Sequence, residues 1–121
     1  MNNLYQKQLL EIYAEKPNFG ELKEKTHSVS YKNPICNDEI VIDLIIQDDI
    51  VKDARFRGVS CFVSTISASV ILDKIKGMNV RDITRINPSE INKWLGTEII
   101  PTRIACELLP LEALKKLGGS N

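Results

Sequence analysis

The chain has 121 residues, a length that fits one domain with its own hydrophobic core, and we expect a single domain over residues 1–121. Hydrophobic residues make up 43% of the chain, and 16 acidic residues balance 16 basic ones, so no net field draws it toward nucleic acid or an anionic membrane. No apolar run approaches the roughly 20 residues that span a bilayer, and residues 1–10 do not have the pattern of a signal peptide. We therefore expect a cytoplasmic protein that uses neither nucleic acid nor membrane as a partner.

The first half of the chain predicts one helix followed by three strands. An amphipathic helix is predicted over residues 2–14, and Pro17 to Gly20 end it. Strands are predicted over 27–32, 40–47 and 50–56. Asp48-Asp49 predicts a hairpin turn of weak type specificity, since it lacks the glycine that two-residue hairpins favour. Strict alternation places one set of side chains on the same face of the third strand, namely Ile50, Lys52, Ala54 and Phe56.

The second half of the chain predicts helices that cover one face of this sheet. Their predicted ranges are 62–76, 79–85, 87–95 and a last region after Pro101. Asn87-Pro88-Ser89-Glu90 is a strong start signal, with a cap residue, a proline at the first helical position and a glutamate at the third. Pro110 should break the last helix or start its second segment. The fold class is α+β: a three-stranded antiparallel sheet with helices packed on one face, an N-terminal helix and a C-terminal helical region.

The three cysteines, Cys36, Cys61 and Cys106, all stand at predicted element boundaries. A free cysteine taken singly is more often a buried core residue than a ligand, but three at such positions favour a shared role. An odd count in a reducing compartment argues against a disulfide framework and favours ligation, redox or catalytic chemistry. Asp38 follows the first cysteine by two residues, so three thiolates and a carboxylate could form a four-ligand site for zinc or iron.

The spacing of the cysteines predicts an open site. Intervals of 25 and 45 residues separate them, so each ligand must come from a different element of the fold. Such a site suits a cofactor that is assembled and given away better than a permanent structural zinc. Cys61 is placed at a helix N-terminus and Arg103 lies three residues before Cys106, and both arrangements favour a thiolate. Small polar residues surround Cys61 and would leave room for a bulky ligand: Ser60, Ser64, Thr65 and Ser67.

Four segments of the chain carry a family resemblance. They are Pro17-Asn18-Phe19-Gly20, Asn33-Pro34-Ile35-Cys36-Asn37-Asp38, Ala54-Arg55-Phe56-Arg57-Gly58-Val59-Ser60-Cys61 and Arg103-Ile104-Ala105-Cys106. In this combination the chain resembles the U-type iron–sulfur cluster assembly scaffolds, which comprise IscU, SufU and the N-terminal domain of NifU. The resemblance covers nearly the whole chain.

The resemblance implies a function and a set of partners. A cysteine desulfurase would deliver sulfur, an iron donor would supply iron, and a 2Fe–2S cluster would form and pass to apo-proteins. Cys36, Asp38, Cys61 and Cys106 match the family's ligands, with zinc as an alternative occupant. Within this hypothesis we expect Cys106 to accept the sulfur and Arg103 to tune it. We expect a scaffold, not an enzyme, either as a monomer or as a homo-oligomer bridged by its cluster.

Two departures from the family pattern and two alternative functions stay open. Asn37 stands where the family usually has glycine, and Ala105 stands where the IscU branch has histidine, which excludes a histidine ligand at that position. The SufU branch shares the arginine but has a longer insertion before the third cysteine. One alternative is a zinc-containing persulfide acceptor that builds no cluster. The other is a thiol enzyme or redox sensor with Cys61 as nucleophile, for which His27 is the only candidate base.

Overall fold

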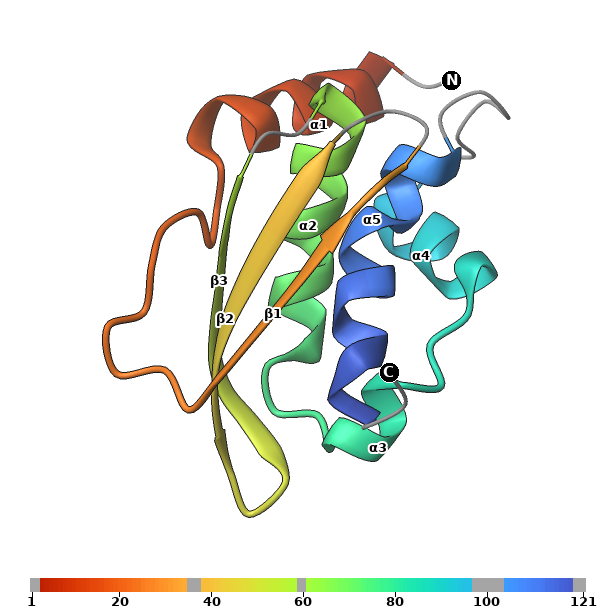
Figure 1. Cartoon of the computed structure of the whole chain (residues 1–121). Coiled ribbons are helices and arrows are strands. Elements are labelled where there is room, and N and C mark those ends of the chain that lie inside the picture. Colours follow the sequence, from red (N-terminus) through yellow and green to blue (C-terminus); the bar gives the residue numbers. More distant parts are fainter. Residues whose placement is uncertain (1–2, 35–37, 59–60, 97–103, 119–121) are drawn as a thin grey trace.

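A computed structural model describes residues 3–34, 38–58, 61–96 and 104–118 as an α+β fold (Figure 1). The elements are α1 (Asn3–Glu15), β1 (His27–Lys32), β2 (Glu39–Gln47), β3 (Ile50–Arg57), α2 (Phe62–Ile75), α3 (Val80–Ile83), α4 (Pro88–Leu95), α5 (Ile104–Leu114) and the short 3-10 helix η2 (Lys115–Gly118). The strands form an antiparallel sheet in the order β1-β2-β3, and α2 and α5 pack on one of its faces. The predicted class and meander are therefore confirmed.

The hairpin between β2 and β3 contains a turn and a bulge. Asp48 and Asp49 have φ values of 54° and 65°, the left-handed conformation at both central positions that defines a type I′ turn. Ile45 pairs with Asp53 but Ile46 pairs with Val51, so β3 carries an extra residue, Lys52, at this point. The predicted alternation of β3 is therefore wrong at its start: Val51 is buried and Lys52 is exposed, whereas Ala54 and Phe56 are buried as expected.

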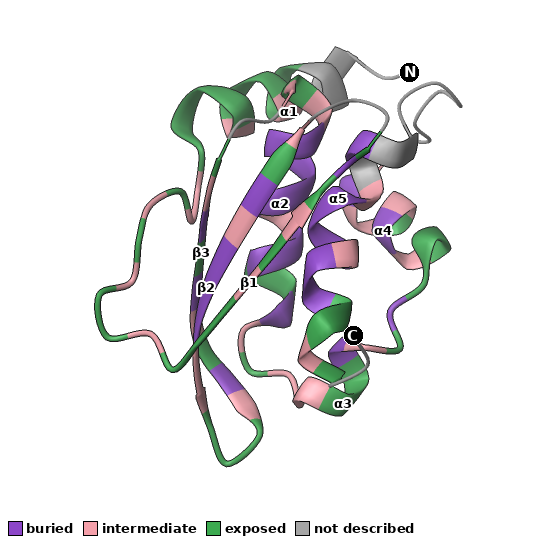
Figure 2. Cartoon of the chain, viewed as in Figure 1, coloured by how far each residue is buried: buried purple, intermediate pink, exposed green. Residues whose placement is uncertain are grey.

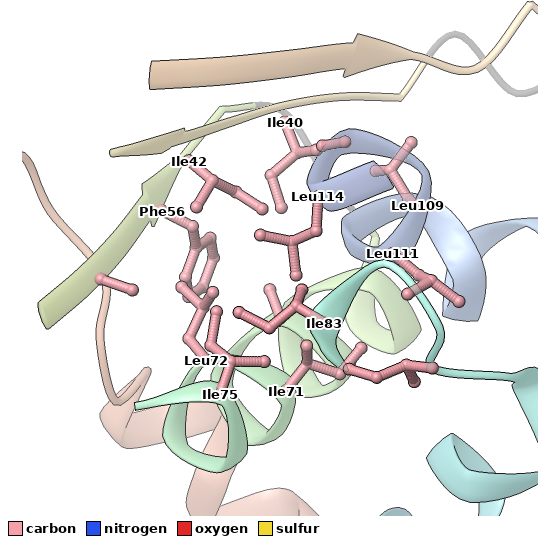
Figure 3. Packing of buried hydrophobic residues seen from close by; sticks show 14 of the residues in the cluster. Ile40, Ile42, Phe56, Ile71, Leu72, Ile75, Ile83, Leu109, Leu111 and Leu114 are labelled. Atoms are coloured by element: carbon pink, nitrogen blue, oxygen red, sulfur yellow. The ribbon is translucent and has the colours of Figure 1, made fainter. Parts of the chain in front are cut away.

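The hydrophobic core lies between the sheet and the helices. Residues of β2, β3, α2, α3, α4 and α5 make up one buried cluster (Figures 2 and 3). Its largest fully buried members are Phe56, Ile40, Ile42, Leu44, Ile71, Leu72, Ile75, Ile83, Ile91, Leu109, Leu111 and Leu114. Because α2 has the sheet on one side and α1, α4 and α5 on others, its serines are buried along with its aliphatic residues. The core thus fixes α2 and α5 side by side.

Two helices test the sequence signals for helix ends. α4 begins at Pro88 after the Asn87 cap, whose side chain accepts from the Glu90 amide, and it ends at Gly96 with φ 75°, as predicted. The prediction that Pro110 breaks the last helix is wrong, because α5 runs through it to Leu114. Pro110 has no N–H to donate to the Cys106 carbonyl, but burial on both sides of the proline offsets that loss. Within the ranges described, no helix is long and apolar enough to cross a membrane.

The loop after α1 is tied to both the sheet and α2. The Phe56 amide donates to the Asn18 carbonyl, and the Gly20 amide donates to the Phe56 carbonyl. The Asn18 side chain donates to the Ser69 carbonyl at 3.0 Å and to Asp73 at 2.9 Å. Asn18 has φ 69°, a conformation that asparagine adopts more readily than most residues. This loop therefore runs beside β3 and closes that edge of the sheet near α2.

Candidate metal centre

Three of the predicted ligands meet at one end of the sheet. Asp38 directly precedes β2, Cys61 directly precedes α2, and Cys106 lies in the first turn of α5. All three elements begin at the upper end of the molecule in the view of Figure 1. One ligand atom from each residue lies within 4.8 Å of the other two. The fold therefore assembles this group from three separate elements, as the spacing predicts.

Cys61 caps the N-terminus of α2. Its backbone is extended (φ −80°, ψ 178°), and its Sγ accepts the Ser64 amide at 3.4 Å. Its carbonyl accepts the Thr65 amide, which starts the helical hydrogen bonds. The side chain is half-buried and faces the unpaired amides and the positive end of the helix dipole. Cys61 therefore lies at a helix N-terminus, the placement expected from the sequence.

Gly58 allows the end of β3 to approach the start of β2 closely. Its φ is +132°, and a Cβ at this residue would lie 2.4 Å from the Glu39 carbonyl oxygen. No side chain fits such an approach, so the end of β3 can lie against the start of β2 only because this residue is glycine. The close contact places Gly58 against Glu39, the residue that follows Asp38.

Asp38 links the two cysteines. Its carbonyl accepts the Asn33 amide at 2.8 Å, which closes the loop between β1 and β2. Its Oδ2 accepts from the Ser64 hydroxyl at 3.4 Å, and the Cys106 thiol points to the same oxygen at 3.8 Å. The carboxylate of this half-buried residue is therefore directed toward both Ser64 and Cys106.

Cys106 is the most deeply buried of the three, with 2% of its surface exposed. α5 packs against α2, β1 and β2, so the cysteine in its first turn faces the interior end of the site. Cys61 is the more accessible sulfur.

The donor chemistry fits a thiophilic metal. In a tetrahedral site, ligands at ordinary zinc–sulfur and zinc–oxygen distances lie roughly 3.3–3.8 Å apart. The Cys106 Sγ to Asp38 Oδ2 distance of 3.8 Å matches this range. The ligand atoms of the group all lie within 4.8 Å of one another, so the others would have to move closer by about 1 Å at most to bind one ion. Two thiolates and a carboxylate suit zinc or iron and do not suit magnesium or calcium. When bound here, such an ion would be held by Asp38, Cys61 and Cys106.

The other predicted site residues are either outside the described residues or elsewhere in α2. Cys36, Asn37 and Arg103 lie outside the described residues, so their roles stay predictions. Thr65 is 4% exposed and bonds the Cys61 carbonyl, and Ser67 is fully buried in the packed helix. Ser64 contacts two residues of the ligand group through its side chain, Asp38 and Cys61.

His27 lies far from the cysteines. It begins β1, whereas the other end of that strand, Lys32, pairs with Glu39 beside Asp38. Five residues of strand place it roughly 16 Å from that end. Its Nδ1 contacts the Thr26 hydroxyl at 2.8 Å, and the residue is exposed. It is therefore not positioned as a base for Cys61, and the thiol-enzyme hypothesis loses its candidate base.

Sequence reasoning missed a buried charge behind the site. Asp43 of β2 is fully buried on the sheet face away from the helices, and it accepts hydrogen bonds from Arg57, Ser28 and the Leu22 amide. Burial raises the pKa of this carboxyl, but the bonds from Arg57 and Ser28, the Leu22 amide and the Arg57 charge together hold the pKa below its ordinary value. The signal available in the sequence was a single aspartate within the otherwise aliphatic stretch 40–46 of a predicted strand, which indicates a buried carboxylate with a partner.

Comparison with known proteins shows the family of this chain. The family model described as the NifU-like N-terminal domain matches residues 4–117. The iron–sulfur cluster assembly scaffold protein IscU of Thermotoga maritima is 38% identical over 129 aligned positions, which cover 93% of this chain and 91% of that protein. The zinc-dependent sulfurtransferase SufU of Bacillus subtilis is 29% identical and covers 96% of this chain and 90% of its own length.

Solved structures show the same fold. The crystal structure of a putative iron–sulfur cluster assembly scaffold protein for the SUF system from Fervidobacterium islandicum superposes with a TM-score of 0.74. The match covers 88% of this chain and 90% of that one at 20% identity, so it bears on the fold alone. The family model and the T. maritima relative carry the assignment: the chain belongs to the NifU-like N-terminal domain family, the U-type scaffold family that its motifs resemble.

Proposed function

We propose that this chain is a scaffold on which a 2Fe–2S cluster is assembled as cargo and then transferred to apo-proteins. The observation that carries the proposal is the meeting of Asp38, Cys61 and Cys106, with ligand atoms within 4.8 Å of one another. Thiolates are the ligands that iron–sulfur clusters prefer, and a carboxylate is a weaker partner that makes the cargo easier to release. Cys36 would be the fourth ligand, from the loop that Asp38 closes.

The sulfur in this proposal comes from the persulfide of a cysteine desulfurase. The Cys106 thiolate attacks the outer sulfur, the S–S bond of the donor breaks, and the donor cysteine leaves as a thiolate while Cys106 becomes the persulfide. Arg103 would favour the ionised form of the attacking thiol. Because Cys106 is 2% exposed, this step requires the first turn of α5 to open toward the donor.

A second function has a specific observation in its favour. The B. subtilis relative is named a zinc-dependent sulfurtransferase, and the same three residues form a donor set suited to zinc. In this version the chain holds zinc, accepts persulfide sulfur from the desulfurase and passes it on without building a cluster. The two versions share the ligands and differ in what the site carries.

The test is anaerobic reconstitution with a cysteine desulfurase, cysteine and ferrous iron, followed by absorbance and by iron and sulfide analysis. The scaffold proposal expects sulfur-to-iron charge-transfer bands and about two iron and two sulfide per cluster. Cys36→Ala and Cys61→Ala should abolish the bands. His27→Ala is the matched control, since His27 could in principle bind a metal but lies at the far end of β1.

The outcomes separate the two versions. A colourless protein that keeps one tightly bound zinc and gains a persulfide, with no cluster, would support sulfur transfer in place of assembly. Mass spectrometry of the persulfide in single-cysteine variants identifies the acceptor, and persulfide on Cys61 with Cys106 unmodified would contradict the role proposed for Cys106. A protein that binds neither zinc nor cluster would contradict both versions.

A further inference from the structure

Ser64 contacts two members of the ligand group, Asp38 and Cys61, without being one of the predicted ligands. The residue is fully buried in the first turn of α2. Its hydroxyl lies 3.4 Å from Asp38 Oδ2 and 3.3 Å from Cys61 Sγ. The Cys106 thiol points to the same Asp38 oxygen at 3.8 Å. The Asp38 carboxylate is therefore in contact with Cys106 directly and with Cys61 through the Ser64 hydroxyl.

The chemistry of these groups assigns the hydroxyl a direction. Bound to a metal, the cysteines are thiolates and Asp38 is a carboxylate, so all three are hydrogen-bond acceptors. The Ser64 O–H is then the donor between them, and the structure has it donating to Asp38. Ligating carboxylates are held by hydrogen bonds of this kind, which fix the oxygen that faces the metal. Without such a donor the Asp38 side chain is free to rotate away from the thiolates.

The backbone and side chain of Ser64 have separate tasks. Its amide donates to Cys61 Sγ at 3.4 Å and so caps the helix, and this bond does not depend on the side chain. Alanine keeps that amide, has the highest helix propensity and removes a single oxygen atom. Replacing Ser64 by alanine therefore removes the contact to Asp38 and leaves the helix start in place.

We propose that Ser64 is the positioning residue for the Asp38 ligand, and that its hydroxyl holds the carboxylate in the orientation that completes the metal site. This inference rests on the proposed function to the extent that Asp38, Cys61 and Cys106 bind a metal. It adds a residue that acts on the site through Asp38.

A double-mutant cycle on zinc affinity tests the inference. Competition with a chromophoric chelator gives the zinc dissociation constant of the unmodified chain, S64A, D38A and the double variant. S64A should weaken zinc binding about 10- to 100-fold, as loss of a ligand-orienting partner commonly does. In the D38A background the same change should have almost no effect, roughly twofold or less, because the residue has nothing left to position.

S69A is the matched control. Ser69 is a buried serine of the same helix, 1% exposed, and its Oγ has no hydrogen-bond partner in the described structure. The change removes the same atom from the same helix without touching the ligand group, so zinc affinity should not move. Cobalt substitution adds a spectroscopic readout: S64A and D38A should shift the visible d–d bands in the same direction, and S69A should leave them unchanged.

Each contrary outcome is distinct. Unchanged zinc affinity in S64A would overturn the inference. A loss of affinity that persists in the D38A background would also overturn it, and would indicate that Ser64 acts on zinc binding through packing or through Cys61. A loss in S69A equal to that in S64A would show a general effect on the helix. Failure of the unmodified chain to bind zinc or cobalt at all would overturn the proposed metal site and this inference with it.

Discussion

Removing the Arg57 guanidinium should destabilise the domain by about 2 kcal/mol at pH 7. Asp43, its partner, is fully buried and ionised, and the Arg57 side chain is 35% exposed. Breaking a fully buried ion pair costs roughly 3–5 kcal/mol because the remaining charge is left uncompensated. Asp43 keeps the Ser28 and Leu22 donors, and solvent screens the outer half of the pair, so the cost falls to that of one charged hydrogen bond.

The destabilisation should depend on pH in a defined direction. The folded-state pKa of Asp43 lies below its ordinary value of 3.8, so the carboxylate stabilises the fold above that value and loses this contribution as pH falls through the folded pKa. Arg57→Met removes one cause of the lowered pKa. The difference in unfolding free energy between the two proteins should therefore be largest near pH 7 and shrink toward pH 3.

Urea and thermal unfolding, followed by circular dichroism at pH 7 and pH 3, measure the effect. About 2 kcal/mol corresponds to a fall in Tm of roughly 6–12 °C for a domain of this size. Arg55→Met is the matched control, since Arg55 pairs directly across from Asp43 in the sheet but is exposed and forms no ion pair with it in the described structure. The reasoning fails if both variants lose equal stability, or if the loss is the same at both pH values.

Three further changes probe the fold by unfolding measurements. Ser69→Ala should raise stability by about 1 kcal/mol, because it removes a buried hydroxyl that has no partner in the described structure; a loss of stability would contradict this. Gly58→Ala should cost more than about 2 kcal/mol and weaken zinc binding, since its Cβ would meet a carbonyl oxygen at 2.4 Å. Gly77→Ala, at φ +89° with open space around it, is the control and should cost about 1 kcal/mol. The double change of Asp48 to asparagine and Asp49 to glycine should add about 0.5–1 kcal/mol, because both positions have positive φ; no gain would argue against the type I′ assignment.

Local sequence signals predicted most of the fold. The Asn87-Pro88 start and the Gly96 stop bound α4 because caps depend on a few neighbouring residues. The bulge at Lys52 was missed because strict alternation assumes that each residue pairs with one partner. Pro110 was expected to end a helix because the local cost of proline is high, but the tertiary burial that offsets this cost is not visible in a local pattern.

At the candidate site, too, residue types could be identified from the sequence but contacts between distant elements could not. Asp38, Cys61 and Cys106 were identified from residue type and context, and the fold brings them together. Ser64 could be named from the sequence as a small polar neighbour, but its place between Asp38 and Cys61 depends on the contact of two elements 26 residues apart. The burial of Asp43 is explained by its hydrogen bond with Arg57 on β3, a contact between two strands that a local pattern does not show.

The wide separation of the ligands along the chain also bears on how folding and loading are related. In an unfolded chain, 25 and 45 residues separate the cysteines, so an ion that held all three would have to close two long loops, and that closure costs entropy. The folded domain has already met that cost, because β2 and α2 each pack against α5 and so bring Asp38, Cys61 and Cys106 together. Under the proposed function, the folded chain would therefore be ready to receive its cargo without first being ordered by it.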